Sequence, residues 1–289
     1  MLVDLVRMTA PDGLRLDGAL MEPELGSRGA GMGTAIICLH GVGGSFYGSN
    51  LFEAVSPALT QRGFAVLWVN TRGHDGLVTT ITTGKRRHFG AAAEIVDECR
   101  LDVAAWTAFV KERGYDRVAL LGHSLGAVKS LYAVAHGTLA EFVVAASPPS
   151  LSYRRLLAGK DGESFRRWID EAKRLIDAGA GDRLFEPNVP FPLVISAKTY
   201  WDKYGAEERY DFLQLLGRID RPTLFTYGEL ELRGEGTPFS GLPERIREIS
   251  GERSRIGAQV IAGADHNYRG VADAWSAAVA NWIDALPGS

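Results

Sequence analysis

Short runs of apolar residues alternate with longer helical patterns along most of this chain. Four runs of strand length occupy residues 34–40, 64–69, 117–121 and 142–146, and helical patterns fill the fifties, residues 94–113 and residues 125–136. The alternation returns with strands at 222–227 and 258–261, a helix at 242–249 and a last helix that begins near Val271. Runs that are apolar throughout suit strands covered on both faces. The pattern predicts an α/β fold with a mostly parallel sheet flanked by helices.

Two further segments complete the expected organisation. Leu2–Thr9 and Leu14–Met21 read as strands joined by the turn Pro11-Asp12-Gly13, which predicts antiparallel strands at one edge of the sheet. Residues 150 to about 200 are charged and irregular, with one expected helix over Ser164–Ala178. We therefore predict a core of residues 1–149 and 219–289, interrupted by residues 150–218, which we call the insertion segment.

Charge and composition exclude several classes of partner. The 32 basic and 35 acidic side chains give a formal charge of −3, which does not favour a nucleic acid or an anionic membrane as partner. Apolar runs stay shorter than the roughly 18–20 residues of a membrane span, and the N-terminus has no signal-peptide pattern, so we expect a cytoplasmic protein. Cys38 and Cys99 fall in a predicted strand and helix and are expected to be buried thiols. The sequence leaves the oligomeric state open.

The strongest chemical motif is Gly122–Gly126, with the sequence GHSLG. It follows a predicted strand and precedes a predicted helix, the context that a nucleophilic serine on a sharp turn requires. The two glycines permit the turn where side chains would collide with backbone, and the helix start directs N–H groups towards the reacting centre. The motif predicts Ser124 as the nucleophile of an acyl-transfer enzyme.

A second glycine-rich turn, His40–Gly44 with the sequence HGVGG, follows the first central strand. Backbone N–H groups stabilise an oxyanion without reorganising, and each such donor is typically worth about 10²–10³ in rate. We predict the N–H groups of Val42 and Leu125 as these donors, with His40 bracing the loop. Gly41 and His123 lie beside these groups and are candidates for substrate contact.

A serine hydroxyl needs a base, and His266 is the histidine best placed to supply one. It lies in Gly263–His266, after the last predicted strand and well downstream of Ser124. The acid that orients it should follow the preceding strand, where Glu231 is our choice and Glu229 the alternative. Asp265 adjoins the histidine and would have difficulty in reaching its ring.

Together these motifs resemble the α/β-hydrolase superfamily, in the family's order and over nearly the whole chain. The resemblance implies an eight-stranded, mostly parallel sheet with a cap inserted after the sixth strand, at the place of residues 150–218. The usual acid of the family is Asp, whereas this chain offers Glu. Residues 70–75 and 90–94 are similar to a branch of esterase-like hydrolases that includes siderophore-ester hydrolases.

Two variable segments bear on the substrate. Residues 85–88, KRRH, read as a solvated basic loop, with a lip of the site that attracts an anionic group as the alternative. In the insertion segment, Tyr200, Trp201 and Tyr204 either line a substrate pocket or anchor the segment to the core. No cluster has metal-ligand spacing, and the glycine-rich turn lacks a phosphate-loop lysine, so neither a metal nor another cofactor is expected.

The predicted function is that of a serine hydrolase that cleaves a carboxylic ester in a small molecule. Ser124 would form an acyl-enzyme, with His266 as base and Glu231 as its orienting acid. The same residues could act on an amide, thioester, lactone or carbon–carbon bond, or transfer the acyl group to an alcohol. A non-catalytic binding protein is the alternative from another class.

Overall fold

The central sheet has eight strands, and their spatial order differs from their order in the chain. The computed structural model describes residues 3–23, 29, 31–234, 236–251 and 255–287; Leu2, the first residue of the first predicted strand, lies outside them. Across the sheet the order is β1 (Asp4–Thr9), β2 (Arg15–Met21), β4 (Ala65–Val69), β3 (Thr34–Leu39), β7 (Arg117–His123), β8 (Val143–Ala146), β11 (Thr223–Gly228) and β12 (Ile256–Ile261). Strand β2 pairs antiparallel with both neighbours and the other pairs are parallel. The predicted mixed, mostly parallel sheet with an antiparallel edge is confirmed.

The central strands are buried on both faces because successive side chains point in opposite directions. In β3, Ile36 and Cys38 belong to one apolar cluster and Ile37 and Leu39 to the other. Ile37 lies opposite Leu67 of β4 and Leu120 of β7 in the parallel register, which explains why the sequence of this strand is apolar throughout.

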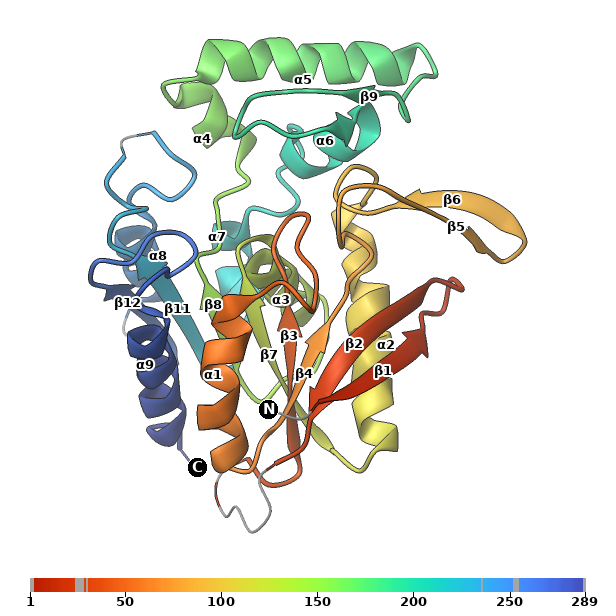
Figure 1. Ribbon diagram of the computed structural model, residues 1–289. Coiled ribbons are helices and arrows are strands. Elements are labelled where there is room, and N and C mark those ends of the chain that lie inside the picture. Colours follow the sequence, from red (N-terminus) through yellow and green to blue (C-terminus); the bar gives the residue numbers. More distant parts are fainter. Residues whose placement is uncertain (1–2, 24–28, 30, 235, 252–254, 288–289) are drawn as a thin grey trace.

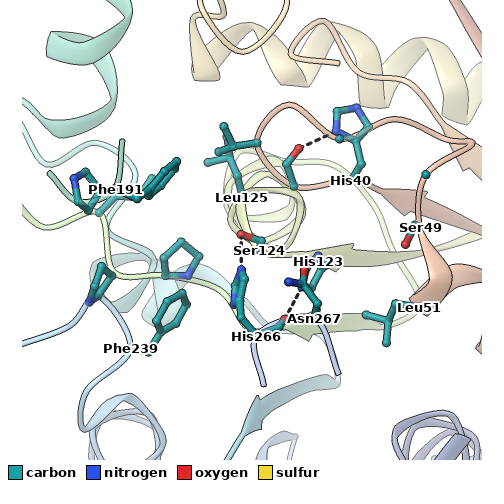
Figure 2. A pocket seen from close by; sticks show the side chains of 18 of the residues that line it. His40, Ser49, Leu51, His123, Ser124, Leu125, Phe191, Phe239, His266 and Asn267 are labelled. Atoms are coloured by element: carbon teal, nitrogen blue, oxygen red, sulfur yellow. Dashed lines mark hydrogen bonds between the residues drawn. The ribbon is translucent and has the colours of Figure 1, made fainter. Parts of the chain in front are cut away.

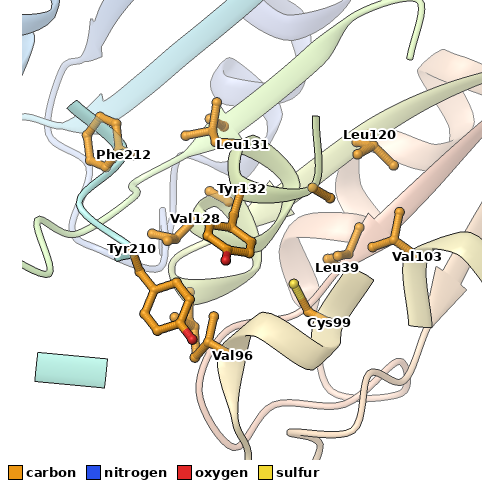
Figure 3. Close-up of a cluster of buried hydrophobic side chains, with 14 of the residues drawn as sticks. Leu39, Val96, Cys99, Val103, Leu120, Val128, Leu131, Tyr132, Tyr210 and Phe212 are labelled. Carbon is orange, nitrogen blue, oxygen red and sulfur yellow. The ribbon is translucent and has the colours of Figure 1, made fainter. Parts of the chain in front are cut away.

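Helices cover both faces of the sheet (Figure 1). Helices α1 (Asn50–Gln61) and α9 (Ala272–Asp284) pack against each other and supply apolar residues to one face. The other face is covered by α2 (Cys99–Glu112), which follows the short 3-10 helix η1 (Val96–Glu98), by α3 (Leu125–Ala135) and by α8 (Leu242–Ser250). Figure 3 shows part of this second layer, where Cys99 and Val103 of α2 face Leu39, Leu120 and the α3 side chains.

The insertion segment is more regular than the sequence indicated. It holds α4 (Tyr153–Ala158), α5 (Gly162–Asp177), α6 (Ala197–Tyr204) and α7 (Phe212–Leu215), the 3-10 helix η2 (Leu216–Arg218), and a small ladder of β9 (Leu184–Phe185) with β10 (Ile195–Ser196). Only the helix at α5 was predicted. The others are too short to show a clear helical period, and α5 was found because it has a strong apolar stripe. Helices α4, α5 and α6 lie above the sheet in Figure 1.

The basic segment at residues 85–88 is a strand rather than a loop, which corrects the prediction. Strands β5 (Val78–Thr82) and β6 (Lys85–Phe89) form an antiparallel hairpin that projects from the side of the molecule (Figure 1). Arg87 lies 3.5 Å from Asp12 and 3.7 Å from Glu98, so part of the basic charge is paired within the chain. Within the described part of the chain, no helix is both long and apolar enough to cross a membrane.

Candidate active site

Ser124 occupies a strained backbone position between β7 and α3. Its φ of +56° is uncommon for a residue other than glycine, and such strain persists where surrounding structure imposes it. The two glycines of the motif make this turn possible. A Cβ at Gly122 would lie 2.2 Å from the Gly126 carbonyl oxygen, and one at Gly126 would lie 2.0 Å from the Leu39 carbonyl oxygen. The predicted steric reason for both glycines is confirmed.

His266 lies between Ser124 and Glu231. Its Nε2 is 3.1 Å from the Ser124 Oγ, and its Nδ1 is 2.7 Å from the Glu231 Oε2 (Figure 2 shows the first contact). An ionised carboxylate only accepts hydrogen bonds, so the Nδ1–H donates to Glu231 and Nε2 is left to accept from the serine hydroxyl. The structure thus brings together the three side chains that were predicted from separate motifs.

The competing carboxylates make other contacts. Glu229 accepts from the Gly263 N–H at 2.8 Å and from Arg233 at 2.6 Å. Asp265 accepts from the N–H groups of Asn267 and Arg269, at 2.9 and 3.0 Å, and so closes the turn that carries His266. The geometry therefore favours Glu231 as the partner of the histidine.

Glu231 is anchored through its other oxygen, Oε1. This atom accepts from the Gly228 N–H at 2.6 Å and from the Ser147 hydroxyl at 2.5 Å, while the Glu231 side chain is only 3% exposed. Sequence reasoning did not single out Ser147. The available signal was its place directly after the predicted strand 142–146, at the strand ends where the other site residues lie.

The glycine-rich loop after β3 approaches Ser124 closely. A Cβ at Gly41 would lie 3.0 Å from the Ser124 Cβ. Neither the Val42 N–H nor the Leu125 N–H has an acceptor among the described residues, and both residues line the cavity beside Ser124. Two donors without partners beside a nucleophile are available to an oxyanion.

His40 braces this loop, as predicted. Its Nδ1 donates to the Gly41 carbonyl oxygen at 2.8 Å, and its Nε2 accepts from the Thr71 N–H at 3.1 Å. Burial, reinforced by the charge of Lys129, lowers the pKa of His40 to about 3. A neutral His40 with one fixed tautomer makes both bonds at once.

His123 supports the loop that carries His266. Its Nε2 donates to the His266 carbonyl oxygen at 2.8 Å, and the two rings are 5.0 Å apart (Figure 2). Burial lowers the pKa of His123 to about 4, with a further contribution from the neighbouring His266. His123 is therefore neutral near pH 7 and also borders the cavity.

A cavity of about 620 Å³ opens above Ser124. One part of its wall is apolar and comes largely from the insertion segment and the loop before α8; it comprises Pro149, Leu151, Pro190, Phe191, Tyr204, Pro238 and Phe239. Another part is polar and comes from the start of α1 and the loop after His266; it comprises Ser45, Ser49, Asn50, Asn267 and Arg269. The predicted contact residues Gly41 and His123 also line it.

Two of the three aromatic residues proposed for substrate contact do not line this cavity. Tyr200 is buried within the insertion segment, where its hydroxyl donates to the Val189 carbonyl oxygen at 2.7 Å and its ring packs on Phe185. Trp201 packs against the apolar core. Only Tyr204 reaches the cavity. Tyr200 lies one helical turn earlier and its ring contacts that of Tyr204, but it is covered by the rest of the insertion segment.

Phe239 and Phe191 are cavity residues that the sequence did not reveal. The Phe239 ring lies 4.8 Å from the His266 ring, and Phe191 reaches in from the loop before β10 (Figure 2). Both lie on loops without a motif, so only the folded chain brings them to the site. Within the described ranges no group of three or more His, Cys, Asp or Glu side chains is arranged to hold a metal ion.

A serine lies on a strand-to-helix turn, beside a His–Glu pair at the strand ends of a mostly parallel sheet. This arrangement is typical of hydrolases with an α/β fold. The chain belongs to the alpha/beta hydrolase family, which its sequence matches over residues 36–288. A search of curated proteins finds no match.

Solved structures with this fold include several esterases. Est1E from Butyrivibrio proteoclasticus has a TM-score of 0.65 at 14% identity, over 96% of this chain and 97% of that one. An esterase from Pyrococcus furiosus has a TM-score of 0.63 at 17% identity, over 99% and 92% of the two chains. The alpha/beta hydrolase GrgF from Penicillium reaches 0.69 at 16% identity, over 98% and 97%. At these identities the likeness concerns the fold.

Proposed function

We propose that this protein hydrolyses carboxylic esters of small molecules through an acyl-enzyme on Ser124. The observation that carries the proposal is the arrangement of Ser124, His266 and Glu231, with 3.1 Å and 2.7 Å between successive partners. A serine hydroxyl becomes nucleophilic when a positioned base takes its proton, and the carboxylate stabilises the imidazolium that forms.

The reaction follows from these positions. The Ser124 oxygen attacks the ester carbonyl while His266 Nε2 takes the hydroxyl proton. The N–H groups of Val42 and Leu125 donate to the oxyanion, and the tetrahedral intermediate collapses as Nε2 returns the proton to the leaving alcohol. Water then attacks the acyl-enzyme, its proton passing through Nε2 to Ser124, and the carboxylic acid is released.

The cavity supports a substrate with an apolar group on one side of the ester. We propose that residues 150–218 act as a cap, since Pro190, Phe191 and Tyr204 from this segment complete the apolar wall. Est1E, one of the proteins that share the fold, has been solved with ferulic acid bound. An aryl or medium-chain acyl group is the matching class for this chain.

The test is turnover of p-nitrophenyl esters, from acetate to phenylpropanoate, together with labelling by a fluorophosphonate. We expect the wild type to hydrolyse the esters and take up the label. Ser124→Ala should lose the label and at least about 10⁴-fold in kcat. Labelling without turnover of any ester would contradict the ester assignment while retaining Ser124 as nucleophile. Absence of both in folded wild-type protein would contradict the whole proposal.

A further inference from the structure

Glu231 ends a buried chain of side-chain hydrogen bonds that crosses from α9 to the site. The Trp275 Nε1 is 2.9 Å from the Thr226 Oγ1, which is 2.9 Å from the Tyr268 hydroxyl. That hydroxyl is 2.9 Å from the Ser147 Oγ, which is 2.5 Å from the Glu231 Oε1. The first four residues are fully buried, so no bulk water competes for these bonds.

The chemistry of Trp275 and Glu231 fixes which partner donates in each hydrogen bond between them. Trp275 can only donate, and an ionised carboxylate can only accept. The single Ser147 proton is therefore given to Glu231, so Ser147 accepts from Tyr268. The Tyr268 and Thr226 hydroxyls also have one proton each to donate, so Tyr268 accepts from Thr226, and Thr226 accepts from Trp275. Burial raises the pKa of Tyr268, which keeps its proton available for donation.

The backbone at two of these residues is held in an unusual conformation. Ser147 has a φ of +50° and Tyr268 a φ of +55°. Such values cost free energy and persist when surrounding contacts impose them, typically at functional sites. The Ser147 N–H donates to the Thr226 carbonyl oxygen at 2.8 Å, which ties the strained residue to the neighbouring strand β11. The strain places the Ser147 hydroxyl against Glu231.

A glutamate needs such support more than an aspartate does. Its side chain has one more torsion, and the terminal torsion has only broad preferences. Here Oε1 is held by the Gly228 N–H and the Ser147 hydroxyl, which leaves Oε2 to face His266. Without the Ser147 hydroxyl, one of these two donors is lost and the carboxylate can turn away from the imidazole.

Building on the proposed function, we infer that Ser147 is a positioning residue for the hydrolytic reaction. It holds Glu231 so that Oε2 faces His266, and Tyr268 and Thr226 in turn orient its hydroxyl. Ser147 acts through Glu231 and does not line the cavity, so it affects the chemical step rather than substrate binding.

The kinetic test compares Ser147→Ala, Tyr268→Phe, Thr226→Val and Thr226→Ser with the wild type. A hydrogen bond to a charged group is worth about 1.5–3 kcal/mol, so Ser147→Ala should lower kcat by roughly 10- to 100-fold with KM unchanged. Tyr268→Phe and Thr226→Val should show smaller losses, and Thr226→Ser, which keeps the hydroxyl, should restore the wild-type rate. The rate of fluorophosphonate labelling should follow kcat.

A matched control separates positioning from loss of a buried hydroxyl. Ser56 is also fully buried, donates to the Phe52 carbonyl oxygen at 2.7 Å and accepts from the Trp68 indole at 3.0 Å, away from the site. Ser56→Ala should lower Tm without lowering kcat. A Ser147→Ala protein with wild-type kcat would overturn the inference. If that variant does not fold, equal kcat in Thr226→Val and Thr226→Ser overturns it instead.

A second readout does not depend on turnover. The His266 Nδ1–H proton, observed by NMR, should exchange slowly with water in the wild type and much faster in Ser147→Ala. Unchanged exchange would contradict the inference even if the protein proved to hydrolyse no ester. Failure of the proposed function, seen as a wild type that neither labels nor turns over, is thus distinguishable from failure of the role of Ser147.

Discussion

Glu231 and Glu229 are two residues apart, yet their side chains make different contacts. Glu231 is buried and contacts His266, whereas Glu229 is part-exposed and joins the Gly263 N–H to Arg233. The difference follows from the turn after β11, where the Gly228 N–H and Ser147 draw only Glu231 inwards. A carboxylate's role here depends on which backbone groups surround it.

A paired substitution tests this assignment. Glu231→Gln keeps the shape of the side chain but can stabilise the wrong imidazole tautomer, so we expect a loss of about 10⁴-fold in kcat. Glu229→Gln should change kcat by less than about threefold, since its contacts are exposed and such pairs contribute little. Ester hydrolysis by both variants is the measurement, and a larger loss in Glu229→Gln would reverse the assignment.

At the scale of elements, a buried ionic cluster ties the insertion segment to the core. Lys203 of α6 and Lys129 of α3 both pair with Glu94, and all three side chains are almost completely buried. Burial raises the pKa of Glu94, but the two ammonium groups outweigh that effect and lower it to about 2. One carboxylate thus compensates two buried cations beside the His40 loop.

The cluster predicts an asymmetric response to substitution. Glu94→Gln leaves two buried ammonium groups without a charged partner and should lower the free energy of unfolding by about 3–5 kcal/mol. Lys203→Met leaves a one-to-one pair of Glu94 with Lys129 and should cost much less. Denaturant unfolding of the two variants measures the difference. Equal losses of unfolding free energy would show that the second buried cation does not destabilise the protein.

At the scale of the whole molecule, the site is assembled at one edge of the sheet. Ser124 follows β7, Ser147 follows β8, Glu231 follows β11 and His266 follows β12, and the carboxyl ends of parallel strands meet at a common edge. Helices cover both faces of the sheet, and α4, α5 and α6 lie above this edge (Figure 1). Residues far apart in the chain thereby reach one cavity.

Two neutral histidines make the stability of the whole molecule depend on pH. His40 and His123 have pKa values lowered to about 3 and about 4 by burial. In the unfolded chain each histidine has a pKa of about 6.5, so the unfolded state binds more protons than the folded state as pH falls. As pH falls below about 6, the free energy of unfolding should therefore decrease by about 1.4 kcal/mol per pH unit for each histidine. The decrease continues until pH reaches the pKa of that histidine in the folded state.

Unfolding free energies measured between pH 7 and pH 5 test this dependence. Burial also raises the pKa values of Asp102, Asp202 and Asp211, which gives a contribution of opposite sign, so the share of a histidine is read from a variant that lacks it. His40→Gln, which keeps one donor and one acceptor, should reduce the slope by the share of one histidine even if it lowers stability overall. An unchanged slope in that variant would show that His40 is not the source.

The sequence predicts the sheet and the grouping of Ser124, His266 and Glu231 well, and the surrounding cavity poorly. Continuous apolar runs identified the buried strands, and the strand–turn–helix context identified Ser124, because both signals are local. For Tyr200 the sequence left a pocket role and an anchoring role open, and Phe191, Phe239 and Ser147 were missed. Their positions depend on how loops and short helices pack against the core, which no local period records.

The two cysteines have a practical consequence for experiments. Cys38 and Cys99 are free, fully buried thiols, as predicted, and burial raises the pKa of both. Their thiolates are therefore scarce and inaccessible to reagents. A single cysteine introduced at Phe191, on the rim of the cavity, would accept a spectroscopic probe selectively with both native thiols left in place. The native chain is thus already suited to placing a fluorescent probe at a single position of its insertion segment.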